Sequence, residues 1–106
     1  MSPHLQSEVA SITSQLISKY HPVKIILFGS GARNDPQAND LDFLIVKNDV
    51  PSRSLDRMRQ VRSLVQKKAA ADFLVMTESE LEDRIRLQDP FALQITQHGR
   101  LLYPDA

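Results

Sequence analysis

The sequence predicts an α+β domain in which a small mixed β-sheet forms one layer and the helices pack mainly on one face of it. The chain has 106 residues, enough for one domain with one hydrophobic core. Its apolar residues occur either at helical spacing or in short continuous runs, and such runs are typical of strands covered on both faces. The elements follow in the order helix, strand, strand, helix, strand, helix, helix and a last short strand. We therefore expect a single domain over residues 1–106 with this two-layer α/β architecture.

The first helix is expected over residues 2–20 and the first strand over residues 23–28. Ser2 can cap the helix, and Pro3 suits its first turn because proline has no N–H to leave unpaired there. Pro22 ends it, because the residue before a proline avoids helical geometry. The apolar stripe of the helix and the apolar run of the strand are formed by Leu5, Val9, Ile12, Leu16, Tyr20, Ile25, Ile26, Leu27 and Phe28.

The middle of the chain predicts a turn, a buried strand and a helix. Residues 29–39 are small and polar and contain at least one turn, and residues 41–46 form the second strand. A helix capped by Ser52 or Ser54 then runs to about Lys68. The apolar stripe of this helix consists of Leu55, Met58, Val61, Leu64 and Val65.

The last third of the chain predicts a strand, two helices and an edge strand. Thr77 and Glu80 have the spacing of a capping box, in which each side chain pairs with the other residue's backbone N–H at the start of a helix. Gly99 ends the second of the two helices. The expected bounds are residues 71–76 for the strand, 77–87 and 89–99 for the helices, and 101–103 for the edge strand.

The composition excludes several classes of protein. The chain has no cysteine, so disulfides and thiolate-bound zinc or iron–sulfur sites are excluded. Thirteen basic residues balance thirteen acidic ones, so no net charge attracts the chain to nucleic acid or to a membrane surface. The apolar runs are too short to span a bilayer, and no signal peptide is visible. We expect a cytoplasmic protein without a membrane partner and without direct nucleic-acid binding.

The segment that carries chemistry is KIILFGSGARNDPQANDLDFLIV, residues 24–46, where a buried strand runs directly into Gly29-Ser30-Gly31. Backbone N–H groups can converge there without obstruction by Cβ atoms, which makes a binding site for anions. Ser30 adds a hydroxyl donor and Arg33 a second contact for a phosphate. A helical turn beginning at Gly31 would add its positive end. The alternative is an ordinary transition from a strand to a turn.

Three aspartates point to a metal site. Asp40 and Asp42 are two apart, so on a strand both side chains leave the same face. Two carboxylates ~6 Å apart repel by about 2–3 kcal/mol at an effective dielectric constant of 20, so an Arg or a hard divalent cation such as Mg²⁺ must compensate them. Asp72 joins them if the second and third strands are neighbours. The alternative places Asp40 in the turn, leaving Asp42 alone on its strand.

These residues resemble the signature of the DNA polymerase beta-like nucleotidyltransferase superfamily. That signature is a hydrophobic strand, Gly-Ser, a spacer, Asp-x-Asp and a later Asp on another strand. The short length and the Gly-Ser-x-Ala-Arg opening are similar to the minimal nucleotidyltransferases (MNT proteins), and the closing Gly-Arg-Leu-Leu-Tyr is similar to the usual end of that family. The resemblance covers nearly the whole chain and implies a single nucleotidyltransferase domain.

The resemblance also implies a role for each residue of the signature. Gly29 and Ser30 would hold the β- and γ-phosphates of the nucleotide. Asp40 and Asp42 would coordinate two Mg²⁺ ions. Asp72 would complete the metal site and help to deprotonate the attacking hydroxyl.

The activity implied is the Mg²⁺-dependent transfer of AMP from ATP to a protein hydroxyl. The implied partner is a HEPN-domain protein, a helical ribonuclease toxin that the MNT antitoxin neutralises by AMP transfer or by binding. One alternative is a non-catalytic nucleotide-binding module that regulates such a partner by binding alone. A third hypothesis is transfer to a small-molecule hydroxyl. It is weakened because three strands and four helices leave no residues for an acceptor domain. A homodimer is left open.

Two charged segments and three histidines carry no assigned role. Six of the seven charged residues in 52–68 are basic, whereas acids outnumber bases by six to three in 77–106. Such segments are usually solvated helix faces, and the alternative is a surface that docks a partner of opposite charge. His4, His21 and His98 lack the spacing of metal ligands.

Overall fold

The computed structural model describes residues 2–33 and 40–104. Within these ranges the chain forms, in order, α1 (Pro3–Tyr20), β1 (Lys24–Phe28), β2 (Asp40–Val46), α2 (Ser54–Leu64), β3 (Ala70–Met76), α3 (Glu78–Arg86), α4 (Pro90–His98) and β4 (Arg100–Tyr103). The predicted order of elements is therefore confirmed. The part of the predicted 29–39 turn segment that follows Arg33 lies outside the described residues.

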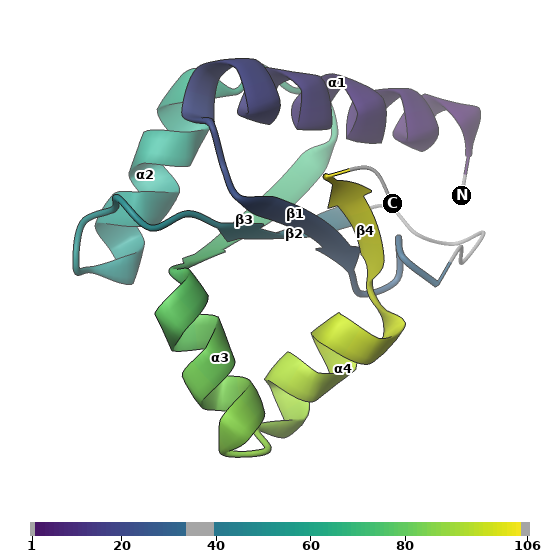
Figure 1. Cartoon of the computed structure of the whole chain (residues 1–106). Coiled ribbons are helices and arrows are strands. Elements are labelled where there is room, and N and C mark those ends of the chain that lie inside the picture. The colour runs from purple at the N-terminus through teal and green to yellow at the C-terminus, as the bar shows by residue number, and fades with distance from the viewer. Residues whose placement is uncertain (1, 34–39, 105–106) are drawn as a thin grey trace.

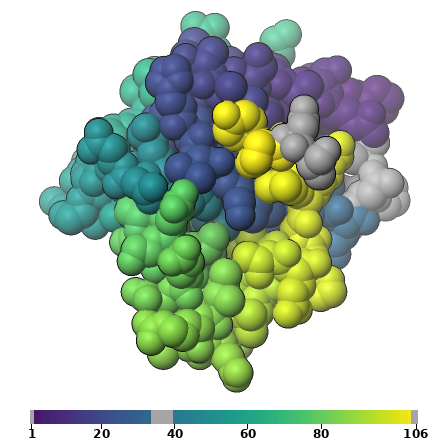
Figure 2. All heavy atoms as spheres, in the orientation of Figure 1, coloured from purple at the N-terminus to yellow at the C-terminus, as the bar shows by residue number. Residues whose placement is uncertain are grey.

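The four strands form one mixed sheet in the order β3-β2-β1-β4 (Figure 1). β1 runs antiparallel to both of its neighbours, whereas β2 and β3 are parallel and are joined by the crossover helix α2. Because of these directions, the end of β1 meets the beginnings of β2 and β3 at one edge of the sheet. β4, drawn in yellow, lies at the surface as the predicted edge strand (Figure 2).

The helices cover both faces of the sheet, two on each (Figure 1). The α+β class is confirmed, but the expected packing mainly on one face is corrected: α1 and α2 cover one face, and α3 and α4 cover the other. The physical reason is that the central strands are apolar on both sides, so each face must be shielded from water. The α1/α2 face includes Ile12, Leu16, Leu27, Phe43 and Phe73, and the α3/α4 face includes Ile26, Leu44, Met76, Leu81 and Ile95.

The helix starts follow the capping residues predicted from the sequence. The Ser2 hydroxyl accepts a hydrogen bond from the N–H of Leu5, and Thr77 and Glu80 form both bonds of the capping box. α1 spans 18 residues, yet neither it nor any other helix in the described part of the chain is long and apolar enough to cross a membrane.

α2 ends at Leu64, four residues before the predicted end. Side chains of α1 pair with the backbone that follows it. The Gln15 amide forms hydrogen bonds with both the N–H and the C=O of Gln66. The Glu8 carboxylate accepts hydrogen bonds from the N–H groups of Lys68 and Ala69. These contacts satisfy the backbone groups that a longer helix would have paired, so the chain leaves the helix and enters β3.

Arg57 lies inside the basic segment 52–68 but is not part of a solvated face, being only 6% exposed. Its guanidinium binds both carboxylate oxygens of Glu80 at 2.7 and 3.2 Å and donates to the backbone oxygens of Pro51 and Val75. The interpretation of this segment as solvated is therefore wrong for Arg57, which ties α2 to β3 and α3.

Candidate active site

The predicted carboxylates come from the beginnings of β2 and β3, at the sheet edge where β1 ends. Asp42 pairs with Asp72 across the parallel strands, and on its other side it faces Phe28, the last residue of β1. Asp40 is the first residue of β2 and pairs with Ala70. Because side chains alternate along a strand, all three aspartates lie on the α3/α4 face of the sheet.

Gly29 begins a turn that closes against Asp42. Its φ angle of 75° lies in the left-handed region, which a residue with a Cβ adopts only at a cost. A Cβ on Gly29 would lie 2.5 Å from Oδ2 of Asp42. The turn is closed by the N–H of Arg33, which donates to the carbonyl of Gly29 at 3.3 Å, and no helix begins within 29–33. The absence of a side chain at Gly29 thus lets the Asp42 carboxylate pack directly against the turn.

The electrostatics of the three aspartates differ. Asp42 is half-buried, and burial first, then the charges of Asp72 and Asp40, raise the pKa of its carboxyl above the ordinary 3.8. Asp72 has a side chain 78% exposed, and its Oδ1 lies 3.7 Å from Nη2 of Arg62. The surroundings of Asp42 therefore disfavour its charged form, whereas the Asp72 carboxylate at the same sheet edge is open to solvent.

The donor set fits a hard divalent cation such as Mg²⁺ in chemistry, since carboxylate oxygens are its usual ligands. Burial and, after it, the charges of Asp72 and Asp40 raise the pKa of Asp42, and a cation would relieve the part that is due to these charges. As they stand, however, residues 2–33 and 40–104 contain no gathered group of three or more acidic, His or Cys side chains able to hold a metal ion.

The sequence matches the model of the family described as Polymerase beta, Nucleotidyltransferase over residues 11–105. The chain belongs to this nucleotidyltransferase family. A solved structure of a candidate nucleotidyltransferase from Sulfolobus solfataricus is similar to it, with a TM-score of 0.59 and 20% sequence identity, over 97% of this chain and 88% of that chain. At that identity the likeness supports the fold alone. Among curated proteins, none matches the sequence.

A cavity of about 580 Å³ in this nucleotidyltransferase domain adjoins Gly29, and sequence reasoning missed most of its lining. Arg33 lines it as well, whereas Phe91, Gln94 and His98 come from α4. Their spacing of three and four residues places them on one face of the helix. This spacing is the sequence signal from which they could have been predicted.

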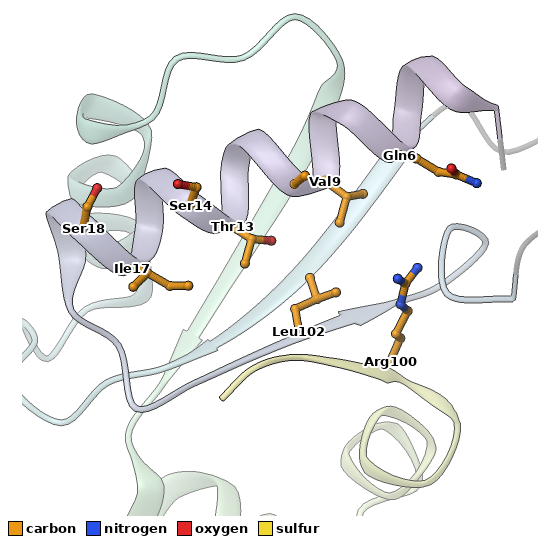
Figure 3. Close-up of a pocket in the computed structure, with 9 residues that line it drawn as sticks. Gln6, Val9, Thr13, Ser14, Ile17, Ser18, Arg100 and Leu102 are labelled. Atoms are coloured by element: carbon orange, nitrogen blue, oxygen red, sulfur yellow. The ribbon is translucent and has the colours of Figure 1, made fainter. Parts of the chain in front are cut away.

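A second cavity, of about 620 Å³, lies between α1 and β4 on the opposite side of the sheet from the aspartates (Figure 3). Thr13 on α1 and Arg100 and Leu102 on β4 line it, and the Thr13 hydroxyl is buried without a hydrogen-bond partner. Because the sheet separates this cavity from the three carboxylates, we do not assign it to the candidate active site.

Replacing Asp42 by Asn should stabilise the metal-free protein at neutral pH. The raised pKa of Asp42 means that the folded state binds its proton more tightly than the unfolded state, so wild-type stability falls as pH rises above about 3.8. The Asn variant lacks this loss, and its advantage should vanish near pH 3.8 and below. Urea denaturation with a chelator across this pH range measures it, with Asp49→Asn, in an exposed position, as the control. A variant less stable than wild type at pH 7 would contradict the prediction.

Proposed function

We propose that this nucleotidyltransferase domain transfers AMP from ATP to a hydroxyl of a protein partner. In this proposal it is an MNT-type antitoxin that neutralises a HEPN-domain toxin. The observation that carries the proposal is the pairing of Asp42 with Asp72 beside the Gly29 turn, on one face of the sheet. Paired carboxylates next to an anion-binding turn are suited to phosphoryl-group chemistry.

Each residue has a distinct task in the proposed reaction. The backbone N–H groups of the Gly29-Ser30 turn and the Arg33 guanidinium bind phosphate oxygens. Asp40 and Asp42, with Asp72, would hold Mg²⁺, which when bound neutralises charge on the phosphates. Asp72 accepts the proton of the acceptor hydroxyl.

The hydroxyl oxygen then bonds to the α-phosphorus of ATP as the bond from that phosphorus to the β-phosphate oxygen breaks. AMP is joined to the acceptor, pyrophosphate leaves, and the proton stays on the Asp72 carboxylate.

The exposure of Asp72 supports a macromolecular acceptor. At 78% exposure, the carboxylate can reach a hydroxyl presented on another protein's surface. A small-molecule acceptor would instead need an enclosing pocket, and the hollow lined by Asp40, Arg62 and Asp72 is open to solvent.

One observation favours a second function, that of a binding module without catalysis. Asp72 pairs with Arg62, which would compete with a metal for the carboxylate. An exposed pair of this kind contributes at most about 1 kcal/mol, so we regard Arg62 as a counter-ion that a bound cation displaces.

Asp72→Asn should separate the two functions. The change is nearly isosteric and lies in an exposed position, so folding and partner binding should persist, while AMP transfer falls by at least ~10²-fold. Intact-mass spectrometry of a purified HEPN-domain protein, incubated with ATP, Mg²⁺ and this chain, should show added AMP for wild type and for the control Asp49→Asn.

The opposite outcome is that the wild-type protein suppresses the toxin without adding mass to it and that Asp72→Asn suppresses it equally well. That outcome would establish the binding module instead.

A further inference from the structure

The cavity beside Gly29 has the composition of a nucleobase site. Phe28 and Gly29 form the side contributed by β1 and its turn, and α4 supplies the facing side. Its volume of about 580 Å³ lies within the ~300–1,000 Å³ typical of small-molecule sites. Gly29 also abuts Asp42, so this cavity and the carboxylates share one boundary residue.

An aromatic ring is available for stacking in this cavity. Phe91 and Phe28 form a T-shaped pair, with ring centroids 5.7 Å apart and planes at 90°. Phe91 is nevertheless 45% exposed, so part of its ring is open to solvent. The contact with Phe28 holds the ring in place, and its exposed part is available to a planar ligand.

Gln94 supplies a polar group of the appropriate kind. It lines the cavity from the same face of α4 as Phe91, one turn further along. A glutamine amide has an NH2 donor group and a carbonyl acceptor side by side, which match N7 and the N6 amino group of adenine, respectively. Guanine presents two acceptors at the corresponding edge, so the same amide satisfies only one of them.

We propose that this cavity binds the adenine base of the donor nucleotide, with Phe91 stacking on the base and Gln94 selecting adenine over guanine. The inference rests on the proposed function, because the phosphates of the same nucleotide would lie on the adjoining Gly29 turn. It assigns to α4 a specificity role that none of the aspartates provides.

The test is a set of calorimetric titrations with Mg²⁺-ATP, Mg²⁺-GTP and Mg²⁺-tripolyphosphate, which has the phosphates without a base. Wild type should bind ATP about 10-fold more tightly than tripolyphosphate, the scale of one base stacked on one ring. Phe91→Ala should remove that advantage and leave the affinity for tripolyphosphate unchanged. Gln94→Ala should reduce the preference for ATP over GTP about 10-fold.

Two variants outside the cavity serve as controls, one for the loss of an apolar side chain and one for the loss of a glutamine amide. Leu87→Ala truncates an apolar side chain that is 73% exposed, and Gln97→Ala removes an exposed amide of α4 that does not line the cavity. Both should bind all three ligands as wild type does.

Equal wild-type affinities for ATP and tripolyphosphate, or unchanged ATP affinity in both Phe91→Ala and Gln94→Ala, would place the base elsewhere and overturn this inference while leaving the proposed function standing. Failure of wild type to bind any of the three ligands would overturn both.

Discussion

Gly29→Ala is expected to abolish measurable nucleotide binding and to destabilise the fold by about 1–3 kcal/mol. The left-handed backbone at this residue strains any residue with a Cβ, and that strain accounts for part of the stability cost. The new Cβ would also meet Oδ2 of Asp42, so the carboxylate must turn away. Nucleotide binding is lost because the turn and the displaced Asp42 carboxylate can no longer contact the same nucleotide. Urea denaturation and calorimetry with Mg²⁺-ATP measure the two effects.

The chain offers a matched control two residues further along the same turn. Gly31 has no positive φ, and a Cβ there would meet nothing closer than 3.4 Å, so Gly31→Ala should leave stability and binding nearly unchanged. Removing the carboxylate in Asp42→Ala should reduce the stability cost of Gly29→Ala, because the Cβ contact disappears while the backbone strain remains. Equal effects of the two glycine substitutions would contradict this account.

Arg57→Ala is expected to destabilise the protein by about 3 kcal/mol. The substitution removes a buried guanidinium and leaves the backbone carbonyl of Val75 without its partner. The magnitude is at the lower end of the range for breaking a buried ion pair, because Glu80 is 45% exposed and can be solvated. Arg59→Ala, an exposed position on the same helix, should change the free energy of unfolding by less than about 0.5 kcal/mol.

The same ion pair should be visible in the pH dependence of stability. Hydrogen bonding from Arg57, and then from the N–H of Thr77, lowers the pKa of Glu80 from 4.5 to about 2. The stabilisation by Glu80 is therefore complete above pH 4.5 and is lost as the pH falls toward 2. Glu80→Gln should lack this part of the acid dependence. If the stabilities of both Arg57→Ala and Glu80→Gln followed that of wild type over this range, the pair would have no role in stability.

The elements of this fold were largely predictable because local signals agree with the tertiary structure. Ser2, Thr77 and Asp89 each cap the helix that follows them, and the continuous apolar runs became the central strands. The end of α2 was not predictable, since Glu8 and Gln15, about 50–60 residues earlier in the chain, hold the segment after it. Local propensity contains no information about such distant partners.

The sequence by itself determined the candidate residues of the site. The motif of Gly-Ser followed by Asp-x-Asp, together with the family resemblance, points to Gly29, Ser30, Asp40 and Asp42, because turns and alternating strands are local structures. Asp72 was a conditional prediction, since its place beside Asp42 required β2 and β3 to be neighbours.

Only the tertiary structure decided what surrounds these residues. Strand order brings Asp72 opposite Asp42, and the packing of α4 on β1 brings Phe91 and Gln94 to the side of Gly29. Within the basic segment 52–68, likewise, the structure buries Arg57 and places Arg62 beside Asp72. The physical reason is that charge and apolarity are properties of single residues, whereas burial and pairing depend on which distant segments pack together.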